Sequence, residues 1–333
     1  MLQAAVELEL AVIPPYLCAL YSMHPQSNEE AKLIIRSVVV EEMLHLVLAA
    51  NVLNAIGGQP RVAGEEHAPR YPHELPDGVI IDLLPFDSLA VEKFLAVENP
   101  QYDHRRRAEE GELLAARRPE MHISRAKRLE YNTVGAFYAA IVEGLEREAA
   151  RIGEEKLFCG EHSRQITREY YYAGGGLPTL VHNLDSACGA LDEVVHQGEG
   201  DMHSMYDDNG DLAHYYRFEE IKYNRAYLPS DDAGKPTGPP IGVDYTAVYP
   251  MLANPTRDDY RDPDLRAASD AADRTWSDLL RQIDNACDGA PEALLPAVHS
   301  MWTLRDQALV LLANPLANHH GRHAGPTFTW IDT

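Results

Sequence analysis

The sequence has little cysteine and little positive charge. Its four cysteines are widely spaced and form no C-x-x-C pair, so we expect free thiols in a reducing compartment and no disulfide framework. With 29 Lys and Arg against 52 Asp and Glu, the formal charge is −23. Such a chain repels phosphate backbones and anionic lipid, so we expect no nucleic-acid partner and no membrane partner. It also lacks an uninterrupted apolar run of about 18 residues, which favours a cytoplasmic protein.

Helical periodicity is what the sequence does contain. Apolar side chains recur every three or four residues over residues 1–23 and again over 27–58, which predicts two long helices. Ser27 is the expected N-cap of the second helix. Pro14 and Pro15 predict a kink or a new helix start within the first. The two helices are expected to pack as an antiparallel pair.

The rest of the chain divides by composition. Residues 59–125 lose the helical pattern and are predicted to be an insertion with an extended segment, a short helix and a charged, solvent-facing stretch. Helices are expected again over 130–153 and 177–200, followed by a shorter one. We therefore predict a helical bundle over 1–225, and a linker with a C-terminal helical extension packed on it over 226–333.

Two ionisable side chains, Glu42 and His45, interrupt the apolar second helix. Positions i and i+3 share one helix face, so a carboxylate and an imidazole at this spacing converge on one metal ion. Chance supplies about one E-x-x-H match in such a chain, and the pattern matters only because buried charge must be paired or metal-bound. Glu9, on the neighbouring helix, is the expected third ligand, while Glu7 points about 200° away and is expected to face solvent. The alternative for His45 is a core histidine bonded to a backbone carbonyl.

Seven segments, in this order along nearly the whole chain, resemble the ferritin-like family named after iminophenyl-pyruvate dimer synthase, of which this would be a stand-alone member. They are "ELELAVIPPYLCALYSM", "EEMLHLVLAANVLNAIGGQP", "TVGAFYAAIVEGL", "VVHQGEG", "HYYRFEEI", "VYPMLANP" and "GPTFTW". The resemblance implies an all-α fold: a ferritin-like four-helix bundle core with an irregular insertion and additional C-terminal helices. It also implies a metal site whose first half is Glu9, Glu42 and His45.

The second half of the site departs from the family pattern. Ala136 stands where relatives often have Glu, which makes Glu143, seven residues later, the substitute ligand. The motif that usually reads EQGEG is HQGEG here, so the resemblance implies His196 and Glu199 as ligands. Glu193, which completes a second E-x-x-H with His196, is either a rival ligand or a solvated residue.

The "HYYRFEEI" segment supplies one more candidate. His214 matches a family histidine and is expected at the site, as a ligand or beside one. We expect Arg217 to pair with Glu219 or Glu220 rather than with a substrate carboxylate. The glycine run at 174–176, in the segment GGGL, lacks the setting of a phosphate loop and receives no role. The predicted catalytic residues are Glu42, His45 and His214, and the predicted metal ligands are Glu9, Glu42, His45, Glu143, His196, Glu199 and His214.

These expectations lead to a functional hypothesis. The chain is predicted to bind one or two iron ions, with manganese as the alternative, and to use dioxygen to oxidise a small amino-acid-derived substrate in natural-product biosynthesis. One alternative is the coupling of two imines derived from an aromatic 2-oxo acid, the reaction that names the family. Another is a non-catalytic metal-binding or scaffold role for a partner enzyme. Whether the chain forms a homo-oligomer stays open.

Overall fold

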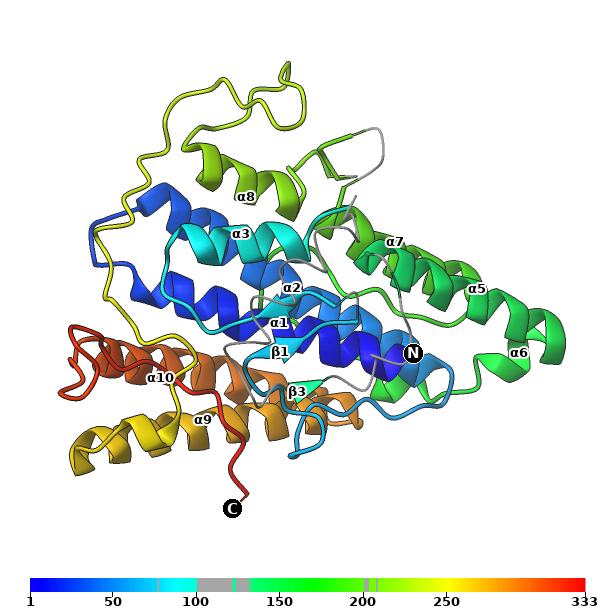
Figure 1. Ribbon diagram of the computed structural model, residues 1–333. Helices are drawn as coiled ribbons and strands as arrows, with labels where there is room; N and C mark the ends of the chain where they lie inside the picture. The colour runs from blue at the N-terminus through cyan, green and yellow to red at the C-terminus, as the bar shows by residue number, and fades with distance from the viewer. Residues whose placement is uncertain are drawn as a thin grey trace.

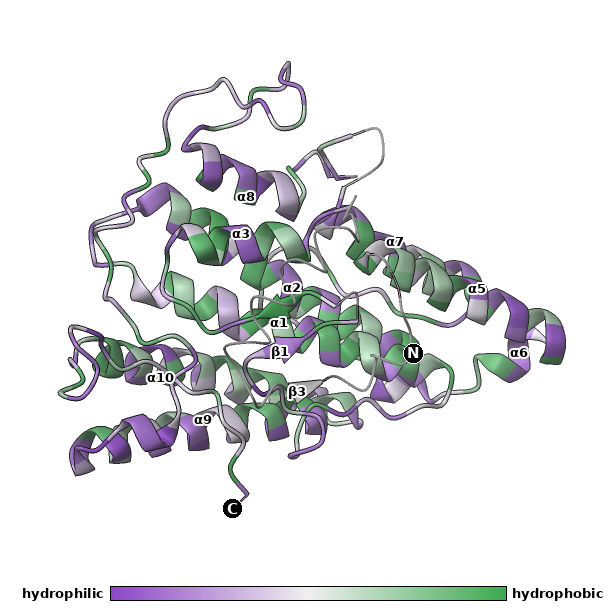
Figure 2. Cartoon of the chain, viewed as in Figure 1, coloured by the Kyte–Doolittle hydropathy of each residue, from purple (hydrophilic) through white to green (hydrophobic). Residues whose placement is uncertain are grey.

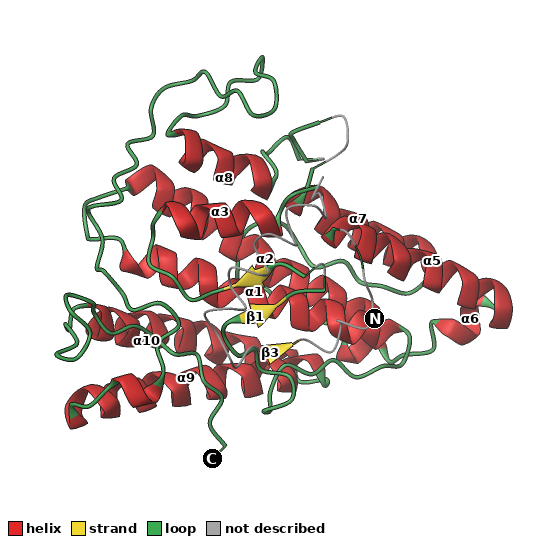
Figure 3. Cartoon of the chain, in the orientation of Figure 1, coloured by secondary structure: helices red, strands yellow, loops and turns green. Residues whose placement is uncertain are grey.

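The computed structural model is dominated by helices (Figures 1 and 3). It describes residues 1–76, 78–100, 122–123, 131, 133–200, 204–207 and 209–332. The charged stretch expected at residues 103–120 lies outside the described residues. Apolar residues gather where the central helices pack together, and polar residues dominate the outer faces (Figure 2). The helical class predicted from periodicity is therefore confirmed.

Helices α1 (Leu2–Ser22) and α2 (Glu29–Ala55) pack along each other at the centre of the molecule (Figure 1). Of the two outcomes predicted at Pro14 and Pro15, a kink or a new helix start, the new start is wrong, because α1 runs through both prolines. Pro15 has no N–H to donate to the Ala11 carbonyl, and the Tyr71 hydroxyl donates to that carbonyl instead, at 2.7 Å. A hydrogen bond from outside the helix thus replaces one that proline removes.

By average hydropathy α1 resembles a membrane span, although glutamates interrupt its apolar run. Its most apolar window has a mean hydropathy of 1.4, but 72 % of that window is buried inside the fold. Burial of this extent is typical of the central helix of a bundle.

Helices α3 (Ser88–Val97) and α8 (His214–Tyr223) lie side by side over α1 and α2 (Figure 1). An aromatic cluster joins them to α1: the Phe94 ring lies 4.6 Å from that of Tyr16 and 5.1 Å from that of Phe218, between centroids. The short helix predicted inside the insertion is thus present as α3, and it is part of the core. This packing fixes where the end of α3 and the start of α8 meet α2.

Helices α5 (Val134–Ile152) and α7 (Leu184–Gly198) pack on each other, and α7 also contacts α2. The helix predicted over 177–200 begins only at Leu184, because the side chains of Asn183 and Ser186 form a capping box that starts it there. The N-cap of α2 is Asn28, one residue after the predicted Ser27. A single-turn helix, α6 (Glu154–Leu157), follows α5.

Helices α9 (Pro263–Cys287) and α10 (Leu294–Leu312) form a hairpin that packs below α1 (Figure 1). The small sheet has the order β2-β1-β3, with β2 (Ile80–Ile81) antiparallel and β3 (His122–Ile123) parallel to β1 (His73–Glu74). Short 3₁₀ helices lie at His162–Arg164, Arg257–Asp259 and Pro291–Ala293. The division of the chain at residue 225 stays a prediction.

Candidate metal centre

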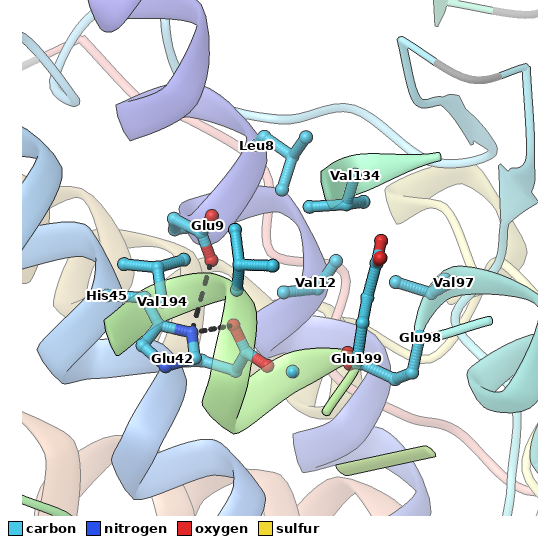
Figure 4. Close-up of a pocket in the computed structure, with 12 residues that line it drawn as sticks. Leu8, Glu9, Val12, Glu42, His45, Val97, Glu98, Val134, Val194 and Glu199 are labelled. Atoms are coloured by element: carbon cyan, nitrogen blue, oxygen red, sulfur yellow. Dashed lines mark ion pairs between the residues drawn. The ribbon is translucent and has the colours of Figure 1, made fainter. Parts of the chain in front are cut away.

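A first group of candidate ligands lies where α1 packs on α2. Glu9 comes from α1, and Glu42 and His45 lie one turn apart on α2. The Nδ1 atom of His45 is 3.4 Å from Glu42 Oε2 and 3.7 Å from Glu9 Oε2, the contacts drawn as dashed lines in Figure 4. One donor atom from each residue lies within 4.8 Å of the other two. We call Glu9, Glu42 and His45 the His45 half-site.

A second group shares Glu42 with the first. Glu98 is the residue directly after α3, and His214 is the first residue of α8. The Nδ1 atom of His214 is 2.9 Å from Glu42 Oε1 and 3.6 Å from Glu98 Oε2. Donor atoms of these three residues also lie within 4.8 Å of one another. We call Glu42, Glu98 and His214 the His214 half-site, and Glu42 turns one carboxylate oxygen toward each histidine.

Hydrogen bonds behind the imidazoles hold both rings in place. Gln197, on α7, accepts from His45 Nε2 at 2.9 Å and donates its own amide N–H to the Gly175 carbonyl at 3.1 Å. Glu41 accepts from His214 Nε2 at 2.8 Å. Both histidines therefore carry a proton on Nε2 and direct Nδ1 toward the carboxylates, the arrangement that orients metal-binding histidines.

Two buried phenols hold the carboxylates at the edges of the cluster. The Tyr138 hydroxyl donates to Glu9 Oε1, and the Tyr16 hydroxyl donates to Glu98 Oε1 at 2.5 Å. Burial raises the pKa of both tyrosines well above the usual range, so they stay protonated donors. Each edge carboxylate thus has one oxygen held by a phenol and the other turned toward a histidine.

The electrostatics of the cluster favour positive charge at its centre. Burial raises the pKa of Glu9 to about 7, and burial together with the charge of Glu42 raises the pKa of Glu98. Burial acts on Glu42 as well, but its interactions with the imidazoles of His214 and His45 outweigh burial and lower the pKa of Glu42. His45 is also buried, yet hydrogen bonds and attraction to Glu42 and Glu9 raise its pKa to about 10. Protons hold the cluster together here, and a metal cation would replace them.

A small cavity of about 20 Å³ opens beside the cluster (Figure 4). Glu9, Glu42, His45 and Glu98 line one part of it. The remaining wall is mainly apolar and consists of Leu8, Val12, Val97, Val134, Val194, Val195 and Gly198, with the carboxylate of Glu199 at its edge. A space of this size accommodates a water molecule or a similarly small molecule next to the candidate ligands.

The residues present fit a divalent cation. Donor atoms around an ion with bonds of about 2.1 Å lie about 3 Å apart, and the nitrogen–oxygen distances here run from 2.9 to 3.7 Å. Among the described residues, His214 Nδ1 is a buried nitrogen without a hydrogen-bond partner, although it faces Glu42. Carboxylates with imidazoles and no thiolate are ligands suited to iron and manganese. The cluster can therefore hold a metal in each half-site.

Three of the seven predicted ligands, Glu143, His196 and Glu199, belong to neither half-site. Glu143 is exposed on α5, because the buried face of that helix includes Ile141, and a residue two positions later points about 200° away. The prediction of Glu143 rests on its seven-residue spacing from Ala136, and Ala136 is itself exposed. His196 is half-buried on α7 and belongs to neither half-site, whereas its neighbour Gln197 reaches His45. The structure thus brings neither Glu143 nor His196 into the two groups of candidate ligands.

Three other glutamates weighed in the sequence analysis enter neither half-site. The predicted ligand Glu199 is buried, lines the cavity and accepts the backbone N–H of Gly135 at 2.6 Å. Glu193 is half-buried on the preceding turn of α7. Glu7 turns away from the cluster, as predicted, and its carboxylate lies 2.8 Å from His67 Nδ1 instead of being simply solvated.

Sequence reasoning missed Glu98, Glu41 and Gln197. Glu98 lies four residues after Phe94 and seven after Val91, both buried on α3, so the helical stripe did mark it as facing the core. It went unnoticed because the segment was taken for an insertion outside the bundle. No sequence pattern singles out Glu41 or Gln197, whose contacts come from chain segments 173 and 152 residues away.

The fold and the cluster together define a helical bundle with a buried carboxylate and histidine centre suited to metal ions. The model of the ferritin-like family matches residues 2–223, well over half of the chain, and the chain therefore belongs to that family. A crystal structure of a ferritin-like protein from Caulobacter vibrioides is similar, with a TM-score of 0.60 at 20 % identity over 99 % of this chain and 96 % of that one. No curated protein matches the sequence. The predicted ferritin-like, all-α fold is confirmed, and the narrower dimer synthase subfamily stays a prediction.

Proposed function

We propose that the cluster holds two non-haem iron ions and that the protein uses them with dioxygen to oxidise a small amino-acid-derived substrate. The observation that carries this proposal is the pair of Glu and His groups joined by the buried carboxylate of Glu42. Glu9 and His45 would complete the ligands of one ion, and Glu98 and His214 those of the other. When bound, iron would supply the one-electron chemistry needed to activate dioxygen.

The protein residues around the ligands support a reaction shielded from bulk water. Leu8, Val12 and Val97 present apolar surface to the cavity, which favours a small apolar molecule such as dioxygen over a charged solute. The Tyr16 and Tyr138 hydroxyls restrain the edge carboxylates, which keeps their free oxygens directed at the cluster. The chain thus fixes the ligands in advance, as preorganised catalytic sites do.

The size of the cavity bears on the alternative reaction. Coupling two aromatic imines requires room for two rings, and a cavity of about 20 Å³ holds no more than a water-sized molecule. Dimer synthesis would therefore require the valines that line the cavity to move, whereas the entry of dioxygen would not require such a movement. This favours an oxidation that uses dioxygen over the coupling of two aromatic imines.

The test is anaerobic reconstitution with Fe²⁺, removal of unbound iron, and measurement of oxygen consumption with and without a panel of aromatic and aliphatic amino-acid-derived imines and 2-oxo acids. We expect one candidate to sustain oxygen consumption well beyond the amount of bound iron, and Glu42→Ala to abolish it. Glu143→Ala is the matched control, because it removes an exposed carboxylate outside the cluster. Oxygen uptake that stops once the bound iron is oxidised, for every candidate, would favour the non-catalytic metal-binding role.

A further inference from the structure

The two half-sites match closely in their direct ligands. Each combines one histidine, the shared Glu42 and one edge carboxylate. Each edge carboxylate accepts a hydrogen bond from a buried tyrosine, so the phenols weaken both carboxylates as donors to a similar degree. A difference in ligand strength between the half-sites must therefore come from the groups behind the histidines.

Those groups differ in charge. The partner of His45 Nε2 is the neutral amide oxygen of Gln197 at 2.9 Å, whereas the partner of His214 Nε2 is the carboxylate of Glu41 at 2.8 Å. A carboxylate attracts the Nε2 proton more strongly than an amide does, which makes the opposite nitrogen a more basic ligand. Arg217 pairs with the other Glu41 oxygen at 2.9 Å and balances its charge, so the effect on His214 passes through the hydrogen bond.

Arg217 reaches Glu41 rather than the predicted Glu219 or Glu220, because its side chain runs back toward α2. Its guanidinium also donates to the Leu212 carbonyl and, at 3.1 Å, to the Ser37 hydroxyl. These contacts fix Arg217, which in turn fixes Glu41 against His214.

The half-sites also differ in their access to the cavity. All three ligands of the His45 half-site line it. In the His214 half-site the carboxylates of Glu42 and Glu98 line it, whereas the imidazole of His214 does not and is completely buried. Small molecules in the cavity would therefore reach every ligand of the His45 half-site but only the carboxylates of the His214 half-site.

From these two differences we infer that the half-sites bind divalent cations with unequal affinity, the His214 half-site filling first and the His45 half-site second. Glu41 and Gln197 are positioning residues that set this order. The inference rests on the proposed function, because it requires that the cluster binds metal. The inferred order also implies that the ion in the His45 half-site is the one that exchanges with solution and the one that a reactant contacts.

The glycine run that received no role from the sequence supports both positioning residues. The Gly175 carbonyl accepts from Gln197, and a Cβ atom placed on Gly175 would lie 2.6 Å from Glu41 Cγ. Gly175 also has φ +80°, a conformation that side chains disfavour. Its backbone can therefore approach α2 closely enough to touch both groups.

The experiment is an anaerobic titration of metal-free protein with Co²⁺ alone, followed by its visible absorption. We expect two binding steps whose affinities differ at least tenfold. Glu98→Ala should remove the tighter step and Glu9→Ala the weaker one, since each residue belongs to one half-site. Two equal steps in the wild type, or loss of the tighter step in Glu9→Ala, would overturn the order.

Glu41→Gln then tests the cause, because it gives both histidines an amide partner. We expect the tighter step to weaken 10- to 100-fold, toward the affinity of the other step. Gln197→Glu should strengthen the weaker step, and Glu143→Gln should change neither. Circular dichroism and thermal melting would establish that each variant is folded. An unchanged tighter step in folded Glu41→Gln would refute the role of Glu41, whereas a wild type that binds no Co²⁺ or Fe²⁺ would refute the proposed function as well.

Discussion

The two half-sites reach the same kinds of ligand through different local structures. Glu9, Glu42 and His45 lie within two long helices, where a regular spacing decides which side chains converge. Glu98 and His214 lie at the end of one short helix and the start of another, brought together by packing. Ligands within helices follow from periodicity, and ligands at helix ends depend on tertiary structure.

The largest effect is expected from the residue that the half-sites share. Glu42→Ala removes one ligand from each and leaves His45 and His214 without their central anion. We expect loss of both ions, measured as iron bound per chain after anaerobic reconstitution and desalting. Glu143→Ala should retain the wild-type amount. Two ions in folded Glu42→Ala would show that the half-sites do not share this ligand.

The aromatic packing that positions the His214 half-site offers a second test of the comparison. Phe218 is fully buried and contacts the rings of both Tyr16 and Phe94. Truncation to alanine should cost about 3–5 kcal/mol of unfolding free energy and loosen the α3–α8 pair. Iron should then be lost from the His214 half-site before the His45 half-site. Denaturant unfolding and iron content measure the two effects, and equal weakening of both half-sites would contradict this account of placement.

The buried carboxylate of Asp273 lies outside the cluster. Its pKa therefore shows the effect of burial on a carboxylate that is not a candidate metal ligand. Burial raises the pKa of Asp273 from 3.8 to about 6, even though Thr327 and Thr329 donate to it. The folded chain therefore holds this proton more tightly than the unfolded chain. Its contribution to stability is fully present below about pH 4 and is lost as the pH rises through about 6, by up to about 3 kcal/mol.

Asp273→Asn should remove that part of the pH dependence in urea unfolding at pH 4 and pH 7. Asp270→Asn is the matched control, because an ion pair with Arg257 lowers the pKa of Asp270. Its contribution has the opposite sign, present above pH 3.8 and lost as the pH falls. The same pH dependence in wild type and Asp273→Asn would rule out Asp273 as its source.

The smallest effect concerns the helix that carries Glu9. Tyr71→Phe removes the donor to the Ala11 carbonyl at the turn where α1 passes through its prolines. We expect a loss of about 1–3 kcal/mol, the cost of an unsatisfied buried carbonyl. Thermal melting would measure it, with Tyr172→Phe, at an exposed tyrosine, as control. If Tyr71→Phe melts at the wild-type temperature, a water molecule donates to the Ala11 carbonyl in place of the Tyr71 hydroxyl.

The sequence was sufficient for much of the fold because its helices are long and well marked. Periodicity located α1, α2, α5 and the C-terminal pair, and the motif order indicated the ferritin-like class. It placed a helix start wrongly in two regions: at Pro14 and Pro15, where α1 continues and a distant tyrosine supplies the missing hydrogen bond, and before Leu184, where a capping box delays the helix. Both errors reflect contacts that a local pattern cannot contain.

The same reasoning explains the uneven prediction of the site. Glu9, Glu42 and His45 share helix faces that spacing identifies, and the structure brings them together with His214. Glu143 was placed by its spacing from Ala136, although that face of α5 is exposed. The composition of residues 59–125 predicts an insertion, which does not direct attention to Glu98, yet α3 packs on α1 and α8 and ends beside the cluster.

The most direct test of the central claim is a crystal structure of the iron-reconstituted protein with anomalous scattering measured at the iron edge. The account predicts two peaks on either side of the Glu42 carboxylate, one beside Glu9 and His45 and the other beside Glu98 and His214. A single peak, or peaks at Glu143 or His196, would contradict the shared cluster.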